Sequence, residues 1–223
     1  MAEPAKDAWS VEPIPDGGGS THTANGVAQG AWRATLCGCF DSILPNCLMV
    51  SFCHCFALAQ VSHRIGSMPY PKTLAISGSL IVTSYVVSII GNQVVASCTA
   101  QMASIQLQAL SPPPNVNYAS WLKGLADQYK SYETQAQTAN SICSAVALIT
   151  GIAAVVLICH VRTKVRLFFR IPGSVGNDCI LSLCCSCCTI AQMATQTQSY
   201  TDGSCRFGPP DVLPAYNDQA AAP

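Results

Sequence analysis

The stretch LAISGSLIVTSYVVSIIGNQVVA, residues 74–96, decides the fold of this chain. It contains no charged side chain, and as a helix it is long enough to cross the hydrocarbon core of a bilayer, which is about 30 Å thick. The stretch SICSAVALITGIAAVVLICHV, residues 141–161, has the same character. Two such stretches in 223 residues favour a membrane hairpin over the buried helices of a soluble domain.

The overall composition agrees with a membrane protein. Hydrophobic residues make up 50% of the chain and charged residues only 10%, whereas about a quarter of a soluble protein is charged. The net charge is zero and no run of Lys or Arg is present, so nucleic acid is not an expected partner. The first twenty residues have no apolar stretch that resembles a cleaved signal, and we expect no secretion by that route.

The charges that flank the two stretches predict their orientation. Basic residues precede the first stretch and crowd the end of the second, whereas the basic residues between the stretches are offset by Asp127 and Glu133. By the positive-inside rule both termini lie in the cytosol, and we expect the plasma membrane. The basic residues before the first stretch are Arg64 and Lys72, those after the second are Arg162, Lys164, Arg166 and Arg170, and those between are Lys123 and Lys130.

The predicted fold class is mainly α, a membrane helical hairpin of two transmembrane helices. A cytosolic Cys-rich domain is assembled from the segments before and after the hairpin, because both emerge at the same membrane face. The expected organisation is a disordered leader (1–30), a first Cys-rich segment (31–71), transmembrane helix 1 (72–98), a partly helical outer loop (99–139), transmembrane helix 2 (140–161), a basic and second Cys-rich segment (162–208) and a flexible tail (209–223).

The fourteen cysteines divide by compartment in this topology. Cys98 and Cys143 fall at the outer ends of the two spans, where an oxidising environment makes them candidates for a disulfide. The cytosolic cysteines are expected to stay reduced. The C-x-C spacing at Cys53 and Cys55 and the CCSCC at 184–188 suit soft ions such as Zn²⁺ or Cd²⁺. Small buried apolar residues or S-acylation sites beside the membrane explain the same spacing equally well.

These segments resemble the placenta-specific eight family, which includes onzin, cornifelin, plant cadmium-resistance proteins and the fruit-weight or cell number regulators. The resemblance covers most of the chain outside the leader and the outer loop. It rests on WRATLCGCFDSILPNCLMVSFCHC, with Trp32 in the family's opening and Cys47, Leu48, Cys53 and Cys55 in its first motif. It also rests on RTKVRLFFRIPGSVGNDCILSLCCSCCTIAQ, with the basic Arg162, Lys164 and Arg166 followed by Asp178, Cys179, Cys185, Cys188 and Gln192.

Two departures from the family pattern bear on a metal site. His54 stands where the family usually has Pro, and it adds an imidazole ligand or is only a turn variant. Ser182 stands where many members have His, so Cys184 or Cys187 would have to supply that ligand. The predicted metal ligands, for zinc or another soft divalent ion, are Cys47, Cys53, His54, Cys55, Cys179, Cys184, Cys185, Cys187 and Cys188.

The resemblance implies heavy-metal resistance, divalent-cation transport or control of cell number. Two helices cannot enclose an ion path, so transport requires a homo-oligomer. Ser77, Ser84, Ser88 and Asn92 recur near one face of the first span and predict a pore lining or a helix contact. A growth-regulating scaffold with a structural metal or acylated cysteines, and an unknown protein partner, is the alternative. A thiol redox protein is a third hypothesis, but no catalytic motif is recognised and we expect no enzyme.

Overall fold

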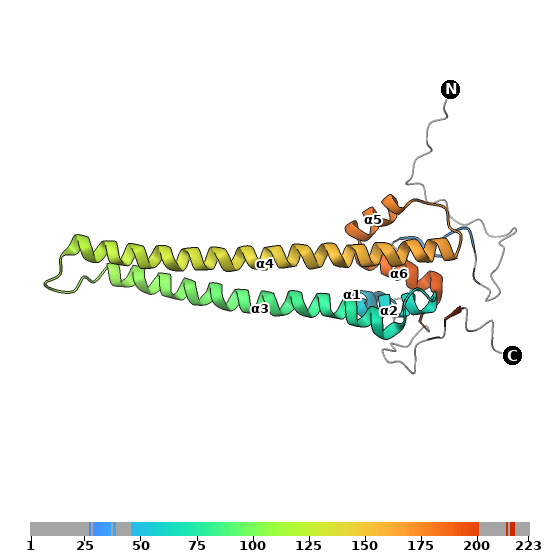
Figure 1. Cartoon of the computed structure of the whole chain (residues 1–223), viewed down its shortest axis with the longest axis horizontal. Coiled ribbons are helices and arrows are strands. Elements are labelled where there is room, and N and C mark those ends of the chain that lie inside the picture. Colours follow the sequence, from blue (N-terminus) through green and yellow to red (C-terminus); the bar gives the residue numbers. More distant parts are fainter. Residues whose placement is uncertain are drawn as a thin grey trace, which may run out of the picture. The chain divides into compact units, whose positions relative to one another are not determined.

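The computed structural model describes residues 27, 29–36, 38, 46–200, 213 and 215–216, and residues 46–200 are helical apart from short connections. No strand occurs among them, so the predicted α fold with two long apolar helices is confirmed. Most of the leader and tail, and Cys37, Cys39 and Cys205, lie outside the described residues. The helices in Figure 1 are α1 (Leu48–Phe52), α2 (His54–Arg64), α3 (Tyr70–Ala109), α4 (Tyr118–Phe168), α5 (Val175–Cys184) and α6 (Ser186–Thr197).

The chain forms two compact units. The first combines residues 1–78 with residues 154–223, and the second is the hairpin of residues 79–153. Each long helix therefore contributes to both units, since α3 begins in the first unit and α4 ends there.

Within the hairpin unit, α3 and α4 pack along a seam with a seven-residue repeat. Ser84 Oγ lies 2.7 Å from Thr150 Oγ1, and the Cys143 thiol donates to the carbonyl of Val87 at 3.5 Å. A Cβ added at Gly91 would collide with the sulfur of Cys143, so this close approach requires glycine. The buried and half-buried positions of α4 alternate steps of three and four, as in a coiled coil: Leu125, Tyr129, Tyr132, Ala136, Ala139, Cys143, Val146 and Thr150.

The outer surface of this hairpin is apolar. In the most apolar window of each long helix only 11% of the residues are buried, which is the reverse of a core helix in a soluble protein. Both helices are long and apolar enough to cross a membrane, and these exposed side chains favour contact with lipid over water. The large exposed apolar residues are Val82, Tyr85, Val86, Ile89 and Ile90 on α3, and Ile142, Leu148, Ile149 and Ile152 on α4.

The helices continue well past their apolar segments. The sequence assigns residues 99–139 to a partly helical outer loop, whereas the structure is helical there except at 110–117. As predicted, α3 stops before the run of three prolines at 112–114, because Pro cannot extend a helix. The side-chain oxygen of Asn117 then accepts from the backbone N–H groups of Ala119 and Ser120 and caps α4.

The other unit has a hydrophobic core between α2, α6 and the end of α4. Leu58, Val61 and Ile190 are almost completely buried there, as are Val161 and Phe169. The first turn of α3 joins this core through a hydrogen bond from Thr73 Oγ1 to Ser62 Oγ at 3.3 Å. The two Cys-rich segments thus pack into one unit, although more than a hundred residues separate them in the sequence.

The same unit contains an internal repeat that the sequence analysis missed. At a constant offset of 132 positions (179 minus 47), α1 and α2 correspond to α5 and α6. Both helix pairs break at a cysteine, Cys53 or Cys185, whose N–H bonds to the carbonyl four residues earlier. The matching buried pairs are Asn46 and Asp178, Val50 and Ser182, Leu58 and Ile190, Ala59 and Ala191, Gln60 and Gln192, and Val61 and Met193.

Candidate functional site

The densest group of thiols lies at the break between α5 and α6. Cys184 ends α5, Cys185 occupies the break, and Cys187 and Cys188 belong to the first turn of α6. Cys185 and Cys188 are joined in a disulfide, with their Cα atoms 5.4 Å apart. Cys184 and Cys187 are free and exposed. This segment therefore combines a closed CxxC pair with two accessible thiols.

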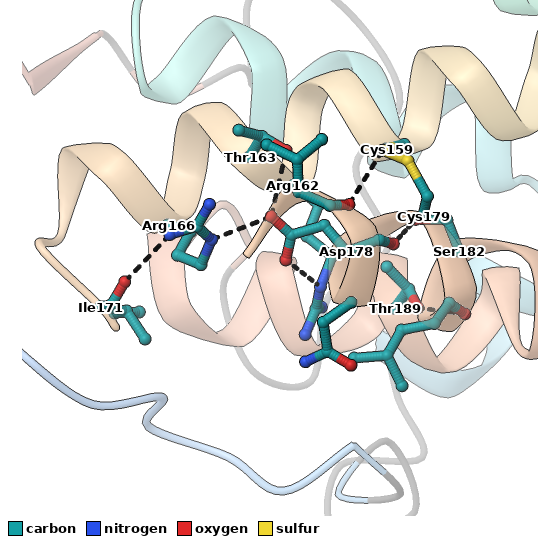
Figure 2. A network of polar contacts seen from close by, with 12 residues as sticks. Cys159, Arg162, Thr163, Arg166, Ile171, Asp178, Cys179, Ser182 and Thr189 are labelled. Atoms are coloured by element: carbon teal, nitrogen blue, oxygen red, sulfur yellow. Dashed lines mark hydrogen bonds and ion pairs between the residues drawn. A yellow bond between two sulfur atoms is a disulfide. The ribbon is translucent and has the colours of Figure 1, made fainter. Parts of the chain in front are cut away.

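A second disulfide joins Cys159 near the end of α4 to Cys179 on α5 (Figure 2). The predicted topology implies reduced thiols at this membrane face, and nothing in the sequence pattern singles out Cys159. Cys47, Cys53 and Cys55 are indeed free thiols, but four other cysteines are paired. The reason is proximity that spacing alone does not reveal, because α5 folds back against α4 and brings these Cα atoms to 5.0 Å.

The predicted metal ligands do not form a preassembled centre. Among the described residues, no three His, Cys, Asp or Glu side chains group closely enough to hold a metal ion. Three of the predicted ligands, Cys179, Cys185 and Cys188, are in disulfides and offer no thiolate. As arranged here, the residues fit a resident metal poorly.

The first cysteine segment has no preassembled metal centre among the described residues either. His54 is the first residue of α2, and partial burial lowers the pKa of its imidazole below 6.5, so the ring is neutral at pH 7. Burial raises the pKa of the Cys55 thiol, with a smaller contribution from neighbouring Cys53. Pro is favoured at the first position of a helix, so the substitution His54→Pro is compatible with the backbone at this site.

The predicted disulfide between Cys98 and Cys143 is not formed, because both are free thiols. Cys143 packs opposite Val87 and Gly91. Cys98 lies seven residues beyond Gly91 along α3, which is a rise of about 10 Å. The two cysteines end their apolar segments at similar positions in the sequence, but the register of the hairpin places them in different layers of the seam.

The four residues predicted to share a pore or contact face have three different surroundings. Ser77 is buried and donates to the carbonyl of Thr73 within its own helix at 2.8 Å. Ser84 contacts α4 through Thr150. Ser88 and Asn92 are exposed on the outside of the hairpin. Only Ser84 therefore serves as a helix contact inside the hairpin.

The carboxylate of Asp178 is the centre of a buried polar network (Figure 2). It accepts from Nε of Arg162 at 3.2 Å and from Nε of Arg166 at 2.9 Å. Thr163 Oγ1 donates to the same carboxylate at 3.0 Å. Asp178 is only 2% exposed, and such a charge is tolerated inside a protein only when it is paired and hydrogen-bonded.

The network extends to the N-terminal segment through Arg162. Its Nη1 donates to Oε1 of Gln192 at 2.9 Å, and Nε2 of Gln192 donates to the carbonyl of Ala34 at 2.8 Å. The guanidinium also lies over the ring of Trp32, 4.4 Å from its centroid, in a cation–π contact. The sequence motifs thus converge on a structural tie between three segments of the chain.

From the sequence, Arg162 and Arg166 are predicted to be flanking charges that orient the hairpin. The structure shows that both are buried against Asp178, while Lys164 and Arg170 remain exposed. A signal for this was present, since the arginines at 162 and 166 are one helical turn apart and therefore share a face. Their partner lies on α5, and helical spacing gives no hint of a contact with another helix.

Comparison with known proteins gives one match. The model of the PLAC8 family matches residues 32–196, which begin at Trp32, end at Gln196 and include Gln192. No curated protein and no solved structure matches the chain significantly. The match covers well over half of the chain and includes both cysteine segments, the long helices between them and the residues of the Asp178 network. This chain therefore belongs to the PLAC8 family.

Proposed function

We propose that this protein captures soft divalent heavy-metal ions, Zn²⁺ or Cd²⁺, with the thiols at 184–188. The observation that carries the proposal is the placement of four cysteines within five positions at a helix break, with Cys184 and Cys187 free and exposed. Thiolate sulfur is the donor that these ions prefer, and four sulfurs satisfy a tetrahedral site. The role is one of binding, and it requires no catalytic residue.

Metal capture is coupled to the redox state of the Cys185–Cys188 bond. A cellular thiol such as glutathione, two molecules per bond, reduces this disulfide to two thiols and is itself oxidised to a disulfide. The ion then displaces the protons of the thiols as it binds their sulfurs. The disulfide form offers two sulfurs and the reduced form four, so the reduced form binds the ion more tightly.

Transport is the finer form of this proposal. The hairpin seam of α3 and α4 is filled by side chains such as Gly91, Cys143 and Thr150, so one copy encloses no path. A homo-oligomer in the plasma membrane, with both termini in the cytosol, would place several cysteine segments at the reducing face. The exposed Ser88 and Asn92 are the polar groups that this assembly would bring together.

The test is the metal content of the purified full-length protein, measured by mass spectrometry after incubation with Cd²⁺ and glutathione and removal of unbound ion. The Ser variant of Cys184, Cys185, Cys187 and Cys188 should lose the metal. The matched control, Cys98→Ser with Cys143→Ser, should keep it, because these thiols lie in the hairpin. His54→Pro should also keep it. Equal metal content in the fourfold variant and the wild type would disprove the proposal.

A second candidate, a scaffold that recruits growth regulators, is favoured by the closed Asp178 network. Residues of the family motifs hold each other there and leave no open ligand site among the described residues. In that case the same thiols are structural or S-acylated. The fourfold Ser variant would then change the protein's location or stability, while cellular Cd²⁺ content would stay at the level of the wild type.

A further inference from the structure

The outward face of α5 is apolar. Ile180 and Leu183 are 50% and 70% exposed, and Cys184 beside them is exposed as well. The opposite face carries Asp178 and Ser182, which are buried against the protein. A short helix with its polar residues inside and its apolar residues outside is inverted relative to a surface helix in water. This face therefore requires an apolar cover.

The direction of α5 follows from its contacts with α4. The carbonyl of Ile171 accepts from Arg166, Asp178 contacts Arg162 and Arg166, and Cys179 is bonded to Cys159. The contacts with α4 move from Arg166 at Ile171, before α5, to Cys159 at Val175, and Cys179 contacts Cys159 as well. Figure 1 shows α5 running from there back toward the middle of α4, so its second half lies toward the apolar segment that includes Val156.

That direction leads into the apolar segment of α4. Cys159 already lies within residues 141–161, and four further residues of α5 advance about 6 Å along it. Leu183 thereby reaches the level of Val156, which is 61% exposed on α4. The exposed cations Lys164 and Arg170 lie in the other direction along the chain. The apolar face of α5 is thus continuous with the apolar surface of α4.

The chain returns through α6. Gln192 of α6 bonds to Arg162, and the carbonyl of Thr197 accepts from Tyr216, whose ring packs on Phe169, so α6 runs in the same direction as α4. Cys188 precedes Gln192 by one turn and therefore lies deeper along α4. We propose that α5 and the first turn of α6 form a re-entrant helical hairpin that enters one leaflet of the bilayer. Lipid acyl chains cover Ile180 and Leu183, and the cysteines at 184–188 form the tip.

The backbone and hydroxyl groups at this tip meet the requirement that a bilayer imposes. The N–H of Cys185 bonds to the carbonyl of Leu181 at 3.0 Å, and the carbonyl of Cys185 accepts from the N–H of Thr189 at 3.0 Å. The hydroxyls of Ser186 and Thr189 also bond to carbonyls, those of Ser182 and Leu181. Polar groups satisfied in this way enter hydrocarbon at low cost.

The internal repeat provides an independent argument. Leu48 corresponds to Ile180, and Phe52 corresponds to Cys184, under the offset of 132. Phe52 is 80% exposed, so the first helix pair also directs a large apolar group outward beside its cysteine break. Contact with one apolar medium, the lipid, explains why apolar side chains are exposed at equivalent positions of both segments. The proposal rests on exposed apolar side chains and not on metal binding, and the metal capture proposed above would then require that ions and glutathione reach the thiols from the cytosolic surface of that leaflet.

The test is depth-dependent fluorescence quenching in the full chain reconstituted in phosphatidylcholine vesicles. Leu183→Trp and Ile180→Trp are made in a background with Trp9→Phe and Trp121→Phe, and Trp32 is kept because it packs against Arg162. Lipids brominated on their acyl chains should quench the new tryptophans several-fold more than iodide does. Lys164→Trp, at an exposed basic position, should show the opposite order.

Two outcomes would overturn the proposal. Strong iodide quenching at Leu183→Trp and Ile180→Trp would place α5 in water. Protection from both quenchers would mean that protein, such as a second copy of this chain, covers the face. Circular dichroism and the elution volume of each variant verify that it folds, and two separate positions on α5 keep the test valid if one of them does not.

Discussion

At the scale of single residues, the buried carboxylate of Asp178 pairs with two arginines of α4. Its carboxylate receives two guanidinium groups and a hydroxyl while almost wholly buried. Buried ion pairs add little to the stability of a fold compared with a well-packed apolar cluster. The loss of one partner lowers the stability strongly, because the other partner stays buried as an unpaired charge. The network therefore fixes the position of α5 on α4 more than it adds to stability.

We expect Asp178→Asn to lower the free energy of unfolding by about 3–5 kcal/mol, because Arg162 and Arg166 would stay buried without a counter-charge. Urea unfolding in detergent micelles, followed by the fluorescence of Trp32, measures this change. Lys164→Gln is the control on the same turn of α4. Because Lys164 is exposed, the loss of its charge should change the free energy of unfolding by less than about 0.5 kcal/mol. A stability loss in Asp178→Asn no larger than in the control would contradict the role of the network.

His54 predicts a dependence of stability on pH. Burial lowers the pKa of the folded imidazole below its ordinary value of 6.5, so the unfolded chain takes up a proton first as the pH falls. The contribution of the neutral His54 imidazole to the stability of the fold is fully present above pH 6.5, and it is lost as the pH falls through the lowered pKa. Thermal unfolding of the wild type and His54→Gln between pH 8 and pH 5, about the range in which His titrates, measures it. The wild type should lose more stability than the variant, and parallel curves would refute the assignment.

At the scale of elements, the hairpin seam depends on one close approach. Gly91 of α3 and Cys143 of α4 leave no room for a Cβ between them. This is a packing constraint that sequence periodicity only hints at, since small residues are common wherever membrane helices meet. The partner of Gly91, and hence the register of the hairpin, becomes clear only when both helices are in place.

Gly91→Ala should destabilise the hairpin by about 1–3 kcal/mol through overpacking against the sulfur of Cys143. Cys143→Ala in the same chain should restore much of the loss, because it removes the atom that collides. The control is Gly151→Ala on α4, where nothing lies within 4 Å of the added Cβ. Unfolding in a titration with sodium dodecyl sulfate measures all four proteins. Equal losses in the single and double variants would show that the register is different.

The Cys159–Cys179 disulfide ties α5 to α4 and closes a loop with a sequence separation of 20. A bond that closes a loop of this size stabilises a fold by about 3 kcal/mol. Cys159→Ser should therefore lower stability by roughly this amount under oxidising conditions and by little in the presence of dithiothreitol. Thermal melts with and without the reductant provide the comparison. A loss that is the same under both conditions would mean that the bond is not formed in the protein.

At the scale of the whole molecule, the sequence predicts the two apolar helices well, because length and lack of charge are local properties. It predicts the end of α3 at the prolines for the same reason. It does not predict the contacts of Asp178, the Cys159–Cys179 bond or the missing Cys98–Cys143 bond, since all of these depend on the register between helices. The repeat is visible in the sequence where Asn46-Cys47 aligns with Asp178-Cys179. It is hard to recognise because some cysteines of one half align with other residue types in the other half, as Cys188 does with Phe56.

The predicted topology has a direct test in intact cells. Tags at both termini should be protected from added protease, whereas a protease site inserted after Asn115 in the connection between α3 and α4 should be cleaved. Permeabilised cells, in which all three sites should be cut, are the control. Arg162 and Arg166 are buried and share the one negative charge of Asp178, so Lys164 and Arg170 are the exposed charges at the end of α4. Cleavage of the terminal tags in intact cells would reverse the orientation.

The repeat at an offset of 132 has a consequence for how this protein can change over generations. The two halves retain one backbone and one set of buried positions but differ in chemistry, since Phe56 stands where the second half has Cys188. The single substitution Phe56→Cys would give the first half a CxxC pair, Cys53 with residue 56, at the positions that correspond to the Cys185–Cys188 disulfide of the second half. One mutation could therefore add a second redox-active pair to this protein.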